Sequence, residues 1–378
     1  MNGHLDAHDV EPQPAARFPN GTGIYQSVPA EEYHGLEGRA SSTVLRKILN
    51  KSPAHGKAKM EDDSDPTPAM KFGTRMHTAL LEPYRFEKDY AVADKCSATT
   101  GSGSRCKSSG QVPWRTAHGD VLWTCNRSSH QPDLGSVDVL DEPCPYCGAE
   151  AGERCETSGG NPAEAHADRR DAAKPVIETE DGDVPIEGRA DVEKISEEQD
   201  EKILAMRKAI KKRPKANLLL NRLPGISELT ILWEHDSSVL CKSRIDRVVE
   251  HDVLGTVAVD YKTTRNAQPG RHEFGRSALR HSYDVQAAFY LEALASVGLP
   301  TDNFCFVAQE KTPPYDVVSY VVPAEPEAAG PSLMEVARQD MESALETYKE
   351  CSTKGEWPGY TGAEDRIQTL KVPHWRYE

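Results

Sequence analysis

Several features that would place this chain in a familiar class of protein are missing from its sequence. No stretch approaches the roughly 18 consecutive apolar residues of a membrane-spanning helix. Residues 1–13 are polar and acidic and lack the apolar segment of a secretory signal, so we expect a cytoplasmic protein. The net charge of −15 excludes a generally basic surface, although a local basic channel is compatible with it.

Motifs for two kinds of nucleotide chemistry are missing as well. The sequence has no glycine-rich P-loop, so we expect no built-in ATP motor. None of the 13 histidines begins the His-x-Glu pattern that zinc deaminases require. The nine cysteines do not suggest a disulfide framework, because their number is odd and no secretory signal precedes them. Three of them (Cys241, Cys305 and Cys351) lie singly and are expected to be buried.

Changes in composition divide the chain into four parts. Residues 1–20 are polar and aperiodic, which predicts a disordered tail. Residues 21–93 predict short helices, and residues 94–185 form an insertion in which Gly, Ser, Asp, Cys and His dominate. Residues 186–378 return to periodic apolar segments and are expected to form the main core.

Periodicity within these parts predicts a core of the α/β or α+β class, with a mixed central sheet flanked by helices. Expected strands are 229–233, 239–249, 256–261, 303–308 and 317–322. Expected helices are 44–49, 69–81, 196–220 with a break at Pro214, 283–295 and 333–348.

A lysine and several acidic residues occur in and around the Val-rich expected strand. Asp260 and Lys262 are two positions apart, so on a strand both point to the same face. A carboxylate in such a place is costly unless it is paired or binds a cation. An ordinary ion pair would explain this tripeptide alone. Two further acids, Glu228 and Asp246, precede it in order, and a helix bearing Gln286 and Tyr290 follows. The ordered set favours a Mg²⁺ or Mn²⁺ site for phosphodiester hydrolysis.

Several sequence blocks in this order resemble the PD-(D/E)xK nuclease superfamily, and within it the RecE-type phage exonucleases. The blocks are Tyr33-His34, Ser41-Ser42, Ser52-Pro53-Ala54-His55 and residues 72–83, 260–264, 283–290, 357–360 and 370–375. The resemblance covers most of the chain outside residues 94–185. It implies a restriction-endonuclease-like core.

The resemblance also implies roles for individual residues. Asp246 and Asp260 match the two metal-binding acids, although Ile245 stands where the superfamily has proline. Lys262 matches the catalytic lysine. The remaining matches are the upstream acid Glu228, the helix histidine His77, and the Gln-x₃-Tyr pair Gln286 and Tyr290, with Glu228 and His77 assisting the metal. For His77 the alternative is a core histidine, and for the last pair it is an ordinary helix surface.

Two groups of three cysteines and one histidine lie in the insertion. Each offers the Cys₃His set that closes a tetrahedral structural zinc site. We expect zinc to supply folding free energy here, because the segment is too polar to build an apolar core. His118 competes with His130 as the fourth ligand of the first group. The groups are Cys96, Cys106, Cys125 and His130, followed by Cys144, Cys147, Cys155 and His166.

The second group resembles small zinc fingers of actinobacterial and actinophage proteins, with Arg169 and Arg170 following the histidine. A purely structural zinc clip and a DNA-contacting finger are both open. Six of the nine residues at 207–215 are Lys or Arg. This basic stretch has two possible interpretations, a path for DNA or a solvated helix face.

Taken together, the resemblance implies a metal-dependent exonuclease that digests linear double-stranded DNA from the 5′ end in phage recombination. The expected partners are double-stranded DNA and a RecT-type single-strand annealing protein, and a homo-oligomeric ring is expected. The alternative is a DNA-binding or recombination-adaptor protein that uses the nuclease fold and zinc fingers with little catalysis. The intact set of Asp246, Asp260 and Lys262 favours the enzyme.

Overall fold

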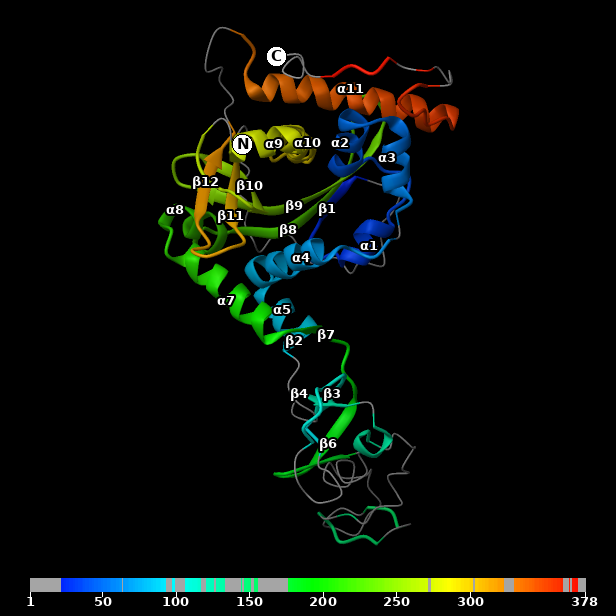
Figure 1. The fold of residues 1–378 in the computed structure, drawn as a ribbon, viewed down its shortest axis with the longest axis vertical. Coiled ribbons are helices and arrows are strands. Elements are labelled where there is room, and N and C mark those ends of the chain that lie inside the picture. The colour runs from blue at the N-terminus through cyan, green and yellow to red at the C-terminus, as the bar shows by residue number, and fades with distance from the viewer. Residues whose placement is uncertain are drawn as a thin grey trace. The chain divides into compact units, whose positions relative to one another are not determined.

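The computed structural model describes residues 22–372 with interruptions, and it separates into two compact units (Figure 1). Residues 1–83 and 204–378 belong to the first unit, and residues 84–203 to the second. The expected tail at 1–20 lies outside the described residues. The interruptions are residues 63, 93–96, 99–105, 117–119, 126, 133–143, 145, 151–152, 156–175, 271–272, 302, 323–329, 363–366 and 368.

A six-stranded mixed sheet is the centre of the first unit, and it confirms the expected fold class. The strand order is β1-β8-β9-β10-β11-β12. Only the β10–β11 pair is parallel, and α9 and α10 make the crossover between these two strands. The strands are β1 (Gly23–Tyr25), β8 (Gly225–Glu234), β9 (Leu240–His251), β10 (Gly255–Thr264), β11 (Phe304–Glu310) and β12 (Val317–Val321).

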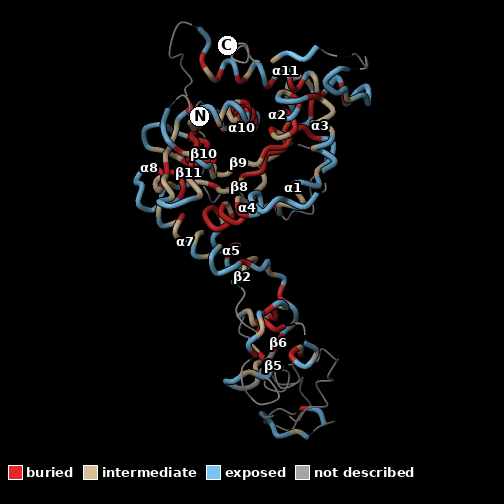
Figure 2. The backbone as a smooth tube through the Cα atoms, viewed as in Figure 1, coloured by how far each residue is buried: buried red, intermediate tan, exposed pale blue. Residues whose placement is uncertain are grey.

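Helices cover both faces of this sheet. On one face the apolar sides of α2, α10 and α11 pack on alternate residues of β8, β9 and β11, around the fully buried Phe289 and Trp233. On the other face α4 contributes buried residues that include Met76 and Ala79 (Figure 2). The helices are α1 (Ala30–Gly35), α2 (Ser42–Asn50), α3 (Pro53–Met60), α4 (Pro68–Leu81), α7 (Glu197–Lys211), α8 (Pro214–Asn217), α9 (Phe274–Arg280), α10 (Tyr283–Ser296) and α11 (Leu333–Lys354), with the π-helical turn η3 (Leu218–Arg222).

Local chemistry fixes the ends of the helices that frame the site. Thr67 caps α4, and its hydroxyl accepts a hydrogen bond from the Met70 N–H. A capping box of Ser332 and Glu335 starts α11. The expected break in the 196–220 helix also occurs, because α7 ends just before Pro214 and α8 begins at it.

The second unit contains a four-stranded sheet of order β4-β3-β6-β5 and a two-stranded sheet of β2 and β7. Contrary to expectation, it has an apolar core, in which Trp114, Ile177 and Ile186 pack with two of the predicted zinc ligands, Cys106 and Cys125. The polar composition of the segment did not indicate this core, because only a few apolar residues form it. The elements are α5 (Pro83–Asp89), β2 (Tyr90–Val92), β3 (Val112–Thr116), β4 (Val121–Thr124), β5 (Val176–Thr179), β6 (Gly182–Arg189), β7 (Glu193–Ile195) and the 3₁₀ turn η1 (Ser128–His130).

None of the helices in the described parts of the chain is long and apolar enough to cross a bilayer.

Candidate active site

Three acidic residues occupy neighbouring positions on β8, β9 and β10. The ladder pairs on either side of Glu228 place it opposite Asp246. The β9–β10 ladder ends where Val259 faces Arg247, one step before Asp260 and Asp246. The acids therefore gather where β9 and β10 stop pairing, and backbone groups that a regular sheet would use are available there for other partners.

Asp246 takes one of these backbone groups. Its Oδ2 accepts a hydrogen bond of 2.7 Å from the Tyr261 N–H and lies 3.4 Å from Nδ1 of His77 on α4. Burial and the charge of Asp260 raise the pKa of Asp246 to about 8, although Lys262 opposes the rise. A cation close to Asp246 would thus favour its ionised form at neutral pH.

Asp260 is fully buried and is held from two sides. The Lys262 Nζ lies 2.5 Å from Asp260 Oδ2. Gln286 on α10 donates a 2.9 Å hydrogen bond from Nε2 to Asp260 Oδ1 and contacts the Tyr290 hydroxyl at 3.1 Å. The two α10 residues share a helix face and fix the orientation of the carboxylate. Both side chains are buried, so Gln286 and Tyr290 are not part of an ordinary helix surface.

Lys262 is a protonated amine in this setting. Burial lowers the pKa of Lys262, but the negative charges of Asp260 and Asp246 act in the opposite direction and the pKa ends above its usual value. The amine can therefore donate hydrogen bonds but does not serve as a base near neutral pH.

Glu228 has a backbone conformation that is rare for a strand residue. Its φ is +51°, in the left-handed region that non-glycine residues seldom adopt and that often marks functional sites. Its Oε2 lies 2.5 Å from Nε of Arg244. Burial and the charge of Asp246 raise the pKa of Glu228. Arg244 was not predicted, although its place two residues before Asp246 on a strand is a signal that could have identified it.

The donor set of this cluster suits a divalent cation. His77, Glu228 and Asp246 place ligand atoms within 4.8 Å of one another. Burial lowers the pKa of His77, which keeps the imidazole neutral, as metal binding requires. The buried Oε1 of Gln286 has no hydrogen-bond partner among the described residues. Three carboxylates face two cations, Lys262 and Arg244, so the donors and the remaining negative charge fit a hard metal ion. Asp260 is not in this compact trio, and its oxygens contact Lys262 and Gln286 instead.

The second unit brings together three ligands of the first predicted zinc group. Cys106, Cys125 and His130 are buried, with ligand atoms within 4.8 Å of one another. Cys125 Sγ lies 3.2 Å from His130 Nδ1. His130 is thus a partner of these cysteines, while His118 and the predicted fourth ligand Cys96 lie outside the described residues.

Three ligands of the second group also meet. Cys144, Cys147 and Cys155 place their sulfur atoms within 4.8 Å of one another. The turn after Cys144 closes through a 2.8 Å bond from the Gly148 N–H to the Cys144 carbonyl, and Gly148 has a φ of +73°, which favours glycine. The predicted fourth ligand, His166, lies outside the described residues.

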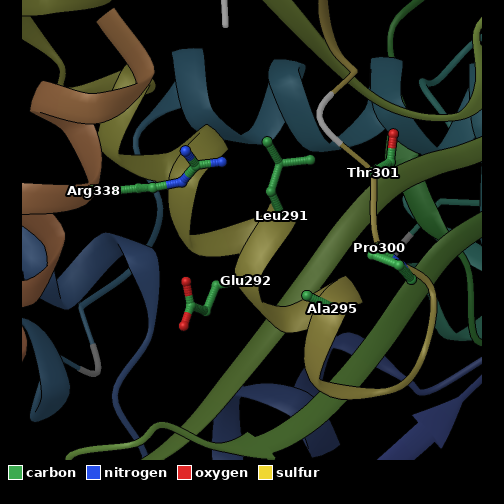
Figure 3. A pocket seen from close by; sticks show the side chains of 6 residues that line it. All are labelled: Leu291, Glu292, Ala295, Pro300, Thr301 and Arg338. Carbon is green, nitrogen blue, oxygen red and sulfur yellow. The ribbon is translucent and has the colours of Figure 1, made fainter. Parts of the chain in front are cut away.

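A separate hollow of about 190 Å³ lies between α10, the loop after it and α11 (Figure 3). It contains one acidic and one basic side chain, and none of the acidic site residues lines it. The hollow is therefore distinct from the carboxylate cluster. Its lining residues are Leu291, Glu292, Ala295, Pro300, Thr301 and Arg338.

Comparison with known families agrees with this geometry. Residues 185–369 match the family described as "PDDEXK-like domain of unknown function". This part of the chain is therefore a PDDEXK-like domain. Residues 125–185 match the "Putative DNA-binding phage zinc finger domain". These matches confirm the predicted superfamily and the zinc-binding segment, whereas the roles of individual residues are not tested by them.

Among curated proteins, none matches this chain. Two crystal structures are similar at low identity. One is titled a "Putative exonuclease" from Eubacterium rectale, with 10% identity, coverage of 93% of this chain and 98% of that chain, and a TM-score of 0.45. The other is the structure of SSO0001, with 14% identity, coverage of 39% of this chain and 66% of that chain, and a TM-score of 0.23.

The raised pKa of Asp246 predicts how stability depends on pH in protein that holds zinc but no Mg²⁺ or Mn²⁺. Between pH 3.8 and about 8 the folded carboxyl keeps a proton that the unfolded one loses, so the free energy of unfolding should fall as pH rises. Asp246→Asn should reduce this slope, which is at most about 1.4 kcal/mol per pH unit for one group. Urea unfolding from pH 5 to 8 measures it.

The matched control is Asp252→Asn, an exposed residue of the β9–β10 turn, which should keep the wild-type slope. Adding Mn²⁺ at pH 8 should stabilise the wild type and Asp252→Asn, but not Asp246→Asn. Equal slopes in all three proteins would contradict the assignment of the buried charge to Asp246.

The two cysteine groups predict the zinc content of the purified protein. We expect two zinc ions per chain in the wild type and one in Cys144→Ser, because each group closes its own site. Elemental analysis measures the ratio. Cys351→Ser on α11 is the control and should retain two ions. A wild type without zinc, or Cys144→Ser with unchanged zinc, would contradict the assignment.

Proposed function

We propose that this protein is a metal-dependent exonuclease that hydrolyses the phosphodiester bonds of linear double-stranded DNA. The observation that carries the proposal is the buried Asp260–Lys262 pair, whose atoms lie 2.5 Å apart beside Asp246. An ion pair that served only stability would not need a second and a third carboxylate next to it.

Each residue of the cluster has a proposed role. Asp246 and Glu228, with help from His77 and Asp260, would hold one or two Mg²⁺ or Mn²⁺ ions. When bound, such an ion supplies a Lewis acid that polarises the phosphoryl oxygen and favours ionisation of water. Protonated Lys262 donates hydrogen bonds that position the attacking water and offset charge on the phosphoryl group.

Gln286 and Tyr290 act through Asp260 in this proposal. Their hydrogen bonds keep Asp260 Oδ1 in place, so Oδ2 stays aimed at Lys262. They are positioning residues, because Gln286 touches the carboxylate and Tyr290 touches Gln286.

The finer features of the proposal come from the resemblance to RecE-type exonucleases. They are cleavage from the 5′ end, a role in phage recombination in the cytoplasm, a RecT-type annealing partner, and a ring of subunits around DNA. The zinc finger match supports DNA as the substrate, because its description names DNA binding.

A second candidate function is a DNA-binding or recombination adaptor that retains the nuclease fold. The two zinc-ligand groups of the second unit favour it, since such sites are independent of the carboxylate cluster. In that case DNA binding would depend on zinc, and the protein would release no nucleotides.

Digestion of end-labelled linear duplex DNA with Mg²⁺ tests the proposal. The wild type should release nucleotides from 5′ ends and spare closed circles. Lys262→Ala should reduce the rate at least about 100-fold, because it removes a charged donor aimed at the reacting phosphate. Lys354→Ala, an exposed lysine on α11, is the control and should retain full activity.

Absence of release by zinc-replete wild type with either Mg²⁺ or Mn²⁺ would contradict the nuclease. Equal rates for Lys262→Ala and the control would contradict the assigned centre.

A further inference from the structure

A group of basic side chains lies beside Lys262, and none of them has a role in the proposed catalysis. Arg46 is on α2, and Arg280 and His281 are at the end of α9 and the start of the next turn. Helices α2 and α10 pack against each other, which brings the two segments together. This is a local concentration of positive charge in a chain whose net charge is −15.

One aromatic ring connects this group to the active site. The Tyr283 ring centroid is 4.9 Å from Lys262 Nζ and 5.7 Å from Arg46 Cζ. The His281 ring stacks on it with a centroid distance of 5.5 Å. Cations at these distances are attracted to the face of an aromatic ring. Tyr283 therefore allows an amine and a guanidinium to lie near each other without a carboxylate between them.

The backbone also holds Arg46 toward the α9–α10 junction. Its Nη1 donates to the His281 carbonyl at 3.2 Å, and its Nε donates to the Ser42 carbonyl at 3.2 Å. Ser282 between the helices has a φ of +49° and exchanges hydrogen bonds with Asn50 of α2. These contacts fix the position of a charge that no acidic residue among the described residues neutralises.

The other cations of the group are accessible. Lys47 and Arg280 are exposed, and the described residues include no salt-bridge partner for either. The nearby acid Asp284 accepts hydrogen bonds from the backbone N–H groups of Asp284 and Val285 at the start of its own helix. Burial and the charges of Arg46, Arg280, Lys47 and Lys262 all lower the pKa of His281, which is consistent with several cations converging on this place.

We propose that this surface, the α2–α10 phosphate site, binds an internal phosphodiester group of the DNA strand next to the one that is cleaved. The inference rests on the proposed function, because it makes Lys262 the adjoining reaction centre. Guanidinium and ammonium groups are the usual partners of DNA phosphates, and such contacts set the position of a strand without reading its sequence. The residues of the site are Arg46, Lys47, Arg280 and His281.

The test is the salt dependence of DNA binding, measured with Ca²⁺ in place of Mg²⁺ so that binding is observed without cleavage. Each lost phosphate contact should reduce the slope of log K against log salt by about 0.9. We expect Arg46→Gln/Arg280→Gln to lower the slope by one to two and to weaken binding about tenfold at low salt. Lys349→Gln, an exposed lysine on α11, is the control and should bind like the wild type.

Two further comparisons, of single variants and of DNA ends, distinguish the possible outcomes. Lys47→Gln and Arg280→Gln alone change exposed side chains, so each should fold normally and lower the slope by about one. The defects should be the same for duplexes with 5′-hydroxyl and 5′-phosphate ends. Unchanged slopes in every variant would overturn the site, and defects confined to 5′-phosphorylated DNA would overturn its assignment to an internal phosphodiester.

This test separates the site from the proposed function. A lowered slope in a protein that releases no nucleotides would support the phosphate site and contradict the nuclease. Nucleotide release with an unchanged slope would support the nuclease and overturn the site.

Discussion

The gathering of like charges at the point where β9 and β10 stop pairing is the constraint on which the rest of the site depends. Burial and the charge of Asp260 both disfavour the ionised form of Asp246. The fold stabilises this arrangement with Lys262 on the same strand and with the Tyr261 N–H, which the end of the ladder leaves available. The carboxylates of the cluster still outnumber the neighbouring basic side chains, so a further cation would stabilise their ionised forms.

The surrounding elements serve this centre from different directions. Helix α4 brings His77 to one side of the sheet, and α10 brings Gln286 to Asp260. The strained Glu228 on β8 completes the row of acids, and Arg244 pairs with it. Each of these side chains comes from a separate element with its own packing, and this packing fixes their relative positions.

Much of this site could be predicted from the sequence, because the periods of strands and helices are local properties. The two-residue spacing of Asp260 and Lys262 and the four-residue spacing of Gln286 and Tyr290 predicted shared faces, and the structure places both pairs together. The left-handed Glu228 and the contact of Arg244 with it depend on strand register, which no local pattern specifies. The stacking of Arg46 on Tyr283 joins segments more than 200 residues apart. The small core of the second unit was missed because its apolar residues are few and widely spaced.

Binding of Mn²⁺ to zinc-replete protein at pH 7.5, followed by electron paramagnetic resonance, tests most directly the claim that this acidic cluster is a divalent-metal centre. We expect the wild type to bind one or two ions and Glu228→Gln to weaken this binding by at least about tenfold. Equal binding by the wild type and Glu228→Gln, or no binding by either, would contradict it.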